Sequence, residues 1–155
     1  MLAIGKTIDR EIALVSRFLA LLLDEQEALK TANPDALPKI HDEKYILVDQ
    51  LKALEIERSS LTALGGPAYS ARERMESWMA EHPAEKQIAA RWQQLIQLCQ
   101  DAKQQNILNA RLVNLHLEQT NQALAILTRD TNESVLYGSN GQAAQYMGRR
   151  IVDSA

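Results

Sequence analysis

The residues with the greatest potential for chemistry in this 155-residue chain are three histidines, His41, His82 and His116, and one cysteine, Cys99. None of the histidines belongs to a Glu-x-x-His or His-Glu-x-x-His pair, the spacings that place metal ligands on one helix face. The chain also contains no Cys-x-x-Cys, glycine-rich phosphate loop or Gly-x-Ser-x-Gly motif. We therefore predict no catalytic residue, no metal ligand and no cofactor, and we expect a protein that is not an enzyme.

The neighbours of these residues favour structural roles. Cys99 lies in an apolar row between Leu95 and Ala102, so we expect a buried structural thiol rather than a nucleophile. His116 lies among leucines, which favours a hydrogen-bonded histidine in a helix interface. The run His41-Asp42-Glu43 is typical of a solvent-exposed helix face.

Composition and charge limit the class of protein. Apolar residues make up 46% of the chain and aromatic residues only 5%, which suits helices packed against helices. A net charge of -3 gives no basic surface for nucleic acid, and no apolar run approaches the roughly 18 residues of a membrane span. The N-terminus lacks the apolar stretch of a signal peptide, and one cysteine fits a reducing compartment. We expect a cytoplasmic protein with one domain.

Apolar residues in the first part of the chain recur every three or four positions, the spacing of one helix face. This pattern predicts a first helix over residues 4–31, which Asn33-Pro34 ends because proline disfavours the α conformation in the residue before it. Its first apolar row consists of Ile8, Ile12, Val15, Leu19 and Leu22, and the second row consists of Leu14, Phe18 and Leu21. Two adjacent rows make a wide stripe, so this helix is expected to pack against more than one neighbour.

A second helix is predicted to begin near Asp35 or Pro38 and to end at Gly65-Gly66-Pro67. Only Lys44 and Arg58 interrupt its apolar series. The following segment, residues 68–83, is less regular.

Within residues 68–83, the pattern predicts a short helix capped by Ser70. Met75, Trp78 and Met79 would share one face of that helix.

The longest predicted element is the segment from Ala84 to Thr128, which contains no proline and no glycine. As one helix it would extend roughly 67 Å at about 1.5 Å per residue, a length that needs a bundle or coiled coil. Its heptad series is Ile88, Trp92, Leu95, Cys99 and Ala102, and it resumes through Leu112, Leu115, Ala123, Ile126 and Leu127. Asn106 and Asn109 interrupt this seam, and two interpretations stay open: buried residues that fix the register, or exposed polar residues. Asn114 is expected to be exposed.

After Arg129 the chain becomes polar and glycine-rich, with small apolar groups between. We therefore divide it into a helical bundle, residues 1–128, and a partly ordered C-terminal tail, residues 129–155. Two interpretations of the tail carry equal weight: a binding segment that becomes ordered on contact, or a terminus that packs on its own bundle. The predicted fold class is all-α, with long antiparallel helices in an up-down bundle or coiled coil.

Several segments together resemble a known family. The second helix reads Ile40-His-Asp-Glu-Lys-Tyr-Ile-Leu-Val-Asp-Gln-Leu-Lys-Ala-Leu-Glu-Ile-Glu-Arg58. This resembles the Glu-Lys, spaced-leucine, Leu-Glu, Arg pattern of flagellar export chaperones of the FlgN type. The long helix adds Arg91-Trp92, Asn106, Asn109 and Thr120-Asn-Gln-Ala-Leu-Ala-Ile-Leu127 in compatible order. The tail segment Leu136-Tyr-Gly-Ser-Asn-Gly-Gln142 is similar to the Leu-Tyr-Gly-x-x-Gly-Gln element that follows the last helix in that family.

The resemblance covers most of the chain, and only residues 65–83 and 146–155 match no pattern of the family. It implies a cytoplasmic chaperone of type III export that binds the C-terminal helical region of the hook-filament junction proteins FlgK and FlgL. Such a chaperone delivers its substrate to the flagellar export gate, where the resemblance assigns the docking contact to Tyr137. The implied partner-binding residues are Leu112, Leu115, Ala123, Leu124, Leu127, Leu136, Tyr137, Gly138, Gly141 and Gln142. The alternative is a helical signalling or scaffold bundle that acts through homodimerisation.

Overall fold

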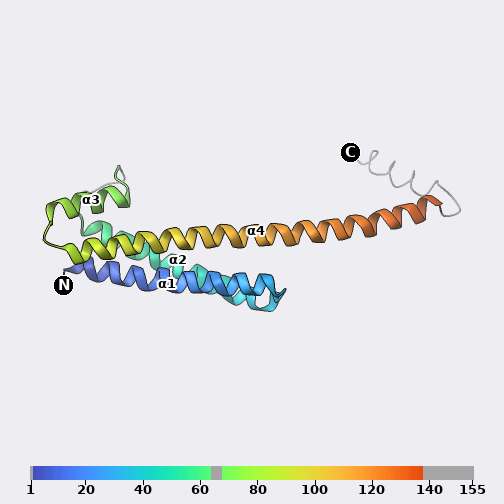
Figure 1. The fold of residues 1–155 in the computed structure, drawn as a ribbon, viewed down its shortest axis with the longest axis horizontal. Helices are drawn as coiled ribbons and strands as arrows, with labels where there is room; N and C mark the ends of the chain where they lie inside the picture. Colours follow the sequence, from blue (N-terminus) through green and yellow to red (C-terminus); the bar gives the residue numbers. More distant parts are fainter. Residues whose placement is uncertain (1, 64–67, 138–155) are drawn as a thin grey trace. The chain divides into compact units, whose positions relative to one another are not determined.

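The computed structural model describes residues 2–63 and 68–137, with side chains as far as residue 129. All regular structure in these residues is helical (Figure 1). The elements in chain order are α1 (Ala3–Lys30), the short 3-10 helix η1 (Pro34–Ala36), α2 (Leu37–Ser60), α3 (Ala71–Glu81) and α4 (Lys86–Tyr137). The chain divides into two compact units, Met1–Leu112 and Val113–Ala155. The predicted all-α class is confirmed.

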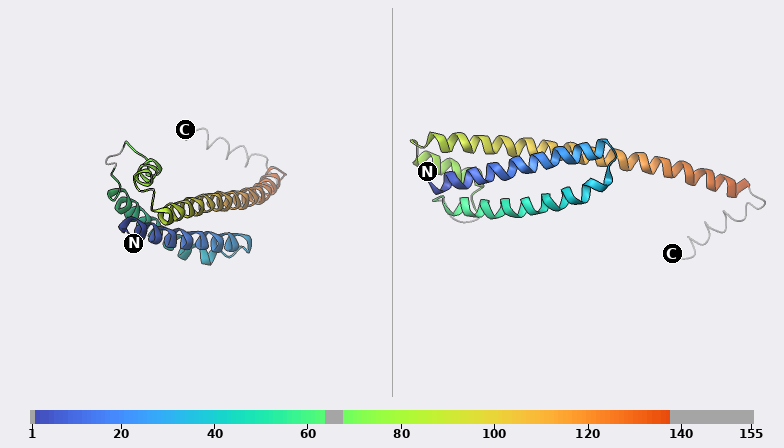
Figure 2. Two further views of the ribbon diagram at one scale, coloured as in Figure 1. Left: turned by 60° about the vertical axis from the view of Figure 1, so that its left-hand side comes forward. Right: turned by 90° about the horizontal axis from the view of Figure 1, so that it is seen from below.

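Helix α1 is the centre of the first unit, because both of its predicted apolar rows are covered. In Figure 2 it lies beside α2 and beside the first part of α4. The first row enters a cluster with α3 and α4, to which α1 contributes the buried residues Ile4, Ile8, Val15 and Leu22. The second row packs against α2, where the buried residues are Leu21, Ile40 and Leu47. The prediction that this helix packs against more than one neighbour is confirmed.

Two ion pairs show that α1 and α2 run antiparallel, as predicted. Arg10 near the start of α1 pairs with Glu57 near the end of α2 at 3.0 Å. Farther along α1, Arg17 pairs with Glu43 near the start of α2 at 2.8 Å. These side chains are partly exposed, so each pair contributes only about 0–1 kcal/mol to the stability of the fold. Their main value is that they show the relative direction of the two helices.

The turn between α1 and α2 contains a residue in the left-handed region. Ala32 has φ of 50°, and the Asn33 N–H donates to the carbonyl oxygen of Ala28 at 2.9 Å. This bond from the third residue after Lys30 back to the last turn of the helix is the Schellman arrangement, which usually places glycine at the left-handed position. Pro34 then begins η1, and α2 follows from Leu37, close to the predicted start.

Helix α3 begins at the predicted cap. Ser70 Oγ accepts a hydrogen bond from the Glu73 N–H at 3.2 Å, and the Glu73 carboxylate accepts one from the Ser70 N–H at 2.7 Å. This reciprocal pair is a capping box, which satisfies two N–H groups that a helix start leaves open. Met75 and Trp78 are buried in the cluster that contains the first row of α1, and Met79 is partly buried against it. The predicted short helix is therefore confirmed.

Helix α4 begins near the predicted position but continues through Arg129 to Tyr137. Residues 130–137 contain neither glycine nor proline, so their polar composition alone does not end a helix. The division into a bundle and a tail at residue 128 stays a prediction, and positions from Gly138 onward lie outside the described residues.

The predicted heptad residues of α4 as far as Ala102 are buried with one exception. The buried ones are Ile88, Trp92, Leu95 and Ala102. Cys99 is exposed, so the prediction of a buried thiol is wrong. The reason is that Cys99 lies at the edge of the heptad row, beside a groove that neighbouring side chains leave open.

Candidate partner-binding surfaces

Most of the predicted partner-binding residues on α4 are exposed. The exposed fraction is 48% for Leu115, 54% for Leu124 and 64% for Leu127, while Ala123 is exposed and Leu112 is half-buried. Single exposed leucines are ordinary, but several on one helix mark an interaction surface. The remaining predicted positions are outside the described side chains, namely Leu136, Tyr137, Gly138, Gly141 and Gln142.

The exposed apolar residues of α4 in the second unit form two rows. One row, which we call the α4 stripe, consists of the apolar residues Val113, Leu117, Leu124 and Leu127, with the polar Thr120 in the middle of the row. Its alternating spacing of four and three residues is that of a coiled-coil seam. Leu112 and Ala123 flank the stripe. The other row contains Leu115 and Ile126. Leu115 is two residues from Val113 and Leu117, and Ile126 is two residues from Leu124, so both lie on the side of the helix opposite the stripe.

Val113 and Leu117 were absent from the predicted set. The heptad count would have found Val113, which lies four residues after Asn109. The next position of that count is His116, so the count does not indicate Leu117. The predicted series instead continues at Leu112 and Leu115. The predicted set therefore includes residues of both rows, with Leu124 in the stripe and Leu115 on the opposite side.

Asn109 is a buried polar residue at the contact between α4 and α1. It is only 1% exposed, and its Nδ2 donates to the carbonyl oxygen of Leu22 at 2.8 Å and to Glu25 Oε1 at 2.9 Å. Gln105 Nε2 donates to Asn109 Oδ1 at 3.0 Å. Asn106 is exposed. Asn109 therefore fits the interpretation of a register-fixing residue, and Asn106 fits the interpretation of an exposed polar residue.

The buried carboxylate of Glu25 connects three helices. Besides the bond from Asn109 on α4, it lies 2.9 Å from Lys44 Nζ and 3.1 Å from His41 Nε2, both on α2. Burial raises the pKa of Glu25, but the hydrogen bonds from Lys44 and Asn109 and the charges of Lys44 and His41 outweigh it, so the pKa is lowered. This explains why Lys44 interrupts the apolar series of α2.

Arg58, the other interruption of that series, forms a buried ion pair with Glu11 of α1. Its Nε donates to both carboxylate oxygens of Glu11, at 3.1 and 2.9 Å, and its guanidinium carbon lies 4.8 Å from the centre of the Trp92 ring. Burial raises the pKa of Glu11 more than Arg58 lowers it. The buried Arg58 Nη1 has no hydrogen-bond acceptor among the described residues.

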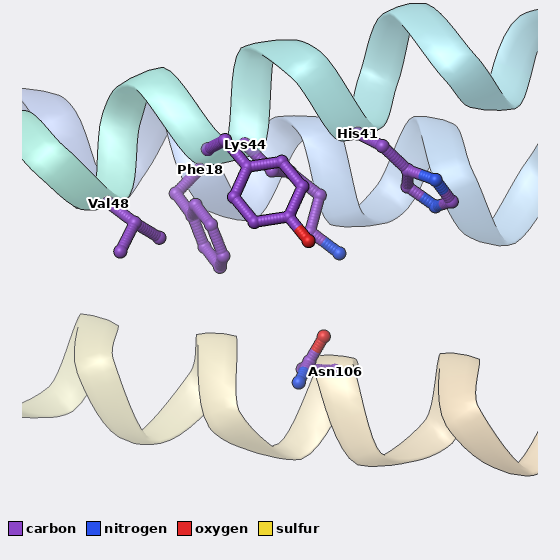
Figure 3. Close-up of a pocket in the computed structure, with 6 residues that line it drawn as sticks. Phe18, His41, Lys44, Val48 and Asn106 are labelled. Carbon is purple, nitrogen blue, oxygen red and sulfur yellow. The ribbon is translucent and has the colours of Figure 1, made fainter.

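A groove lies between α2 and the first-unit part of α4, with α1 beneath it. One of its two hollows has a volume of about 390 Å³ and is lined by Phe18, His41, Lys44, Tyr45, Val48 and Asn106. Figure 3 shows α1 and α2 side chains on one side of this hollow and Asn106 of α4 on the other. The second hollow, of about 340 Å³, shares Val48 and includes Leu51, Arg58, Leu95, Ile96 and Cys99. We call the two together the α2–α4 groove.

The groove offers little to catalysis. Partial desolvation, followed by the charge of Glu11, raises the pKa of the Cys99 thiol, so this thiol is protonated and weakly nucleophilic at neutral pH. In the part of the chain that the structure describes, no group of three or more His, Cys, Asp or Glu residues could hold a metal ion. The same residues include no helix that is both long and apolar enough to cross a membrane.

Comparison with known proteins gives a consistent result. The family model described as FlgN protein matches residues 3–145. Two curated proteins named "Flagella synthesis protein FlgN", one from Yersinia enterocolitica and one from its serotype O:8 / biotype 1B, are each 38% identical over 66 residues. The matched stretch covers 41% of this chain and 44% of each relative, so the chain spans less than half the length of these relatives. No solved structure matches the chain.

Proposed function

This chain belongs to the FlgN family, and we propose that it is a cytoplasmic chaperone of flagellar type III export. It binds the C-terminal helical region of the hook-filament junction proteins FlgK and FlgL and delivers them to the flagellar export gate. The binding surface is the C-terminal half of α4 with the tail that follows. Its proposed residues are Leu112, Leu115, Ala123, Leu124, Leu127, Leu136, Tyr137, Gly138, Gly141 and Gln142.

The observation that carries this proposal is the exposed α4 stripe. Leu117 and Leu124 are 57% and 54% exposed and lie on one helix face at heptad spacing. An amphipathic helix of another protein can pack against such a face and cover both apolar surfaces. A chaperone needs this capacity and no catalytic group, because its task is to prevent its substrate's amphipathic helices from associating with one another.

The test is co-purification of the unaltered chain with FlgK or FlgL, followed by comparison of two variants. Leu124→Glu places a charge on the stripe and should weaken the complex at least about tenfold, because a buried unpaired charge is costly. Ala125→Glu adds the same charge at an exposed position of the same helix, away from the stripe and from Leu115, and should bind normally. Absence of any complex with the unaltered chain would refute the function. Normal binding by Leu124→Glu would remove the stripe from the site.

Docking on the export gate is tested separately at Tyr137. Tyr137→Ala should retain junction-protein binding and weaken binding to the purified gate component. Loss of junction-protein binding with normal gate binding would reverse that assignment.

A second candidate is a signalling or scaffold bundle that acts through homodimerisation, and the same heptad spacing favours it. Light scattering of the free protein at several concentrations separates the two. A tight dimer that Leu124→Glu dissociates, together with no binding to FlgK or FlgL, would favour the scaffold. A monomer that forms a complex with a junction protein would favour the chaperone.

A further inference from the structure

We propose that the α2–α4 groove is a second docking site, which accepts one amphipathic helix of the junction protein as an additional member of the bundle. A neutral side chain on that helix accepts a hydrogen bond from Arg58 Nη1. This inference rests on the proposed function for the identity of the partner. It concerns the first unit alone and a surface separate from the α4 stripe.

The dimensions of the groove suit a helix. Along α2, the lining residues extend from His41 to Arg58, which corresponds to roughly 26 Å, or about five helical turns. Helix α3 has only 11 residues, and its first residue, Ala71, lines the same hollow as Arg58. The short helix therefore leaves most of this length uncovered.

The lining of the groove is mainly apolar and comes from three helices. Its apolar side chains include Val15 of α1, Val48 and Leu51 of α2, and Leu95 and Ile96 of α4. A surface framed by two helices with a third beneath it is the position that another helix takes in a bundle. A partner helix with apolar residues every three or four positions would cover it.

Arg58 provides an independent indication of an occupant. Its side chain is only 5% exposed and lines the groove, its Nε is bonded to Glu11, and its Nη1 has no acceptor among the residues that the structure describes. Buried donors in folded proteins are nearly always paired, because an unpaired one loses its hydration without compensation. The groove therefore favours an occupant that brings an acceptor to Nη1.

The charges around Arg58 restrict the kind of acceptor. Glu11 already neutralises the guanidinium. The other two charged residues that line this hollow, Lys52 and Glu55, carry charges opposite to each other, so they add no net charge. A carboxylate from the partner would add a second anion beside Glu11 in a poorly solvated site. The acceptor that fits is neutral: the side-chain oxygen of Gln, Asn, Ser or Thr on the apolar face of the partner helix.

Cys99 offers a direct test, because it is the only cysteine of the chain, is exposed, and lines the groove. The rate at which a maleimide reagent modifies Cys99 is measured for the full chain alone and in its purified complex with FlgK or FlgL. Occupation of the groove should slow the reaction at least about tenfold. The control is the double variant Cys99→Ser with Ile56→Cys, since residue 56 is 72% exposed on α2 and does not line the groove. Its rate should not change.

The outcomes separate this inference from the proposed function. If the complex forms and Cys99 reacts as fast as in the free chain, the groove is not a docking site, while the chaperone function stands. If the control thiol is protected as strongly as Cys99, the protection is not specific to the groove and the inference fails. If no complex forms with the unaltered chain, the function and the inference fail together.

The hydrogen bond to Arg58 has its own test. Glu11→Met with Arg58→Met removes the donor while replacing both members of the buried pair, a change that keeps such cores folded. The double variant should melt at a similar temperature and bind the junction protein about tenfold more weakly, because the partner's buried acceptor loses its donor. The matched control, Arg10→Met with Glu57→Met, removes the exposed pair between the same two helices and should bind normally. Equal affinity of the two double variants would overturn the role of Arg58.

Discussion

Asn109 donates a 2.8 Å hydrogen bond to the carbonyl oxygen of Leu22, a residue 87 positions earlier in the chain. The same amide donates to Glu25, one turn farther along α1. Sliding α4 by one helical turn along α1 would separate the amide from both acceptors and leave it buried without partners. The pair therefore favours one register of α4 against α1 at a point where apolar contacts alone would tolerate several.

Replacing this amide should destabilise the first unit. Asn109→Ala is expected to lower the free energy of unfolding by about 1–3 kcal/mol, the usual cost of breaking buried hydrogen bonds. Asn106→Ala removes the same kind of side chain three residues earlier, at an exposed position. This control should change the free energy of unfolding by less than about 0.5 kcal/mol. Urea unfolding followed by circular dichroism measures both. Equal effects would show that burial of Asn109 does not matter.

The effect of Arg58 on the free energy of unfolding should depend strongly on whether Glu11 is present. Arg58→Met alone leaves the Glu11 carboxylate buried beside an apolar side chain, and such changes cost about 3–5 kcal/mol. Adding Glu11→Met should restore most of that loss, because the uncompensated charge is gone. A double-mutant cycle built from urea unfolding measures the coupling. If the effects of the two single changes on the free energy of unfolding simply added up in the double variant, the predicted coupling would be contradicted.

The helices could be predicted from the sequence because their signals are local. The apolar rows of α1 and the cap at Ser70 depend on residues within one or two turns of each other. Helix α4 extends beyond its predicted end at Thr128 to Tyr137, because a polar composition alone does not end a helix. The chain offers no glycine or proline between Ala84 and Gly138, and these are the residues that end helices for physical reasons.

The candidate surfaces were less predictable because they depend on contacts between helices. Charged residues in an apolar series, such as Lys44 and Arg58, indicate buried pairs, but no spacing reveals that their partners are Glu25 and Glu11 on another helix. Cys99 has the spacing of a core residue, and its exposure follows from the open side of the bundle. That openness is a property of the tertiary structure alone.

The turn after α1 contains a site where the sequence is not optimal. Ala32 adopts φ of 50°, where its Cβ is unfavourably placed and glycine is not. Ala32→Gly should therefore raise the free energy of unfolding by roughly 0.5–1 kcal/mol. Ala20→Gly, at an exposed position inside α1, should lower it by about 1 kcal/mol. Thermal unfolding of the two variants checks the prediction, which a loss of stability in Ala32→Gly would contradict.

Glu25 should make the protein less stable in acid. Its pKa in the folded chain lies below the ordinary value of 4.5, so the unfolded chain binds the proton more tightly. The stabilisation is present above about pH 4.5 and is lost as the pH falls through the folded pKa. The advantage of the unaltered chain over Glu25→Gln should therefore shrink between pH 6 and pH 3 in urea unfolding. A constant difference across that range would refute the assignment.

Glu11 should have the opposite effect on the pH dependence. Burial raises its pKa above 4.5 in the folded chain, so between these two pKa values the folded chain holds the proton that the unfolded chain has lost. Its contribution to stability then falls as the pH rises from about 4.5 through the folded pKa. Glu11→Gln, which cannot ionise, should gain in stability relative to the unaltered chain over that interval, whereas Glu25→Gln loses. If both variants moved in the same direction in urea unfolding, Arg58 would stabilise the Glu11 carboxylate more than burial penalises it.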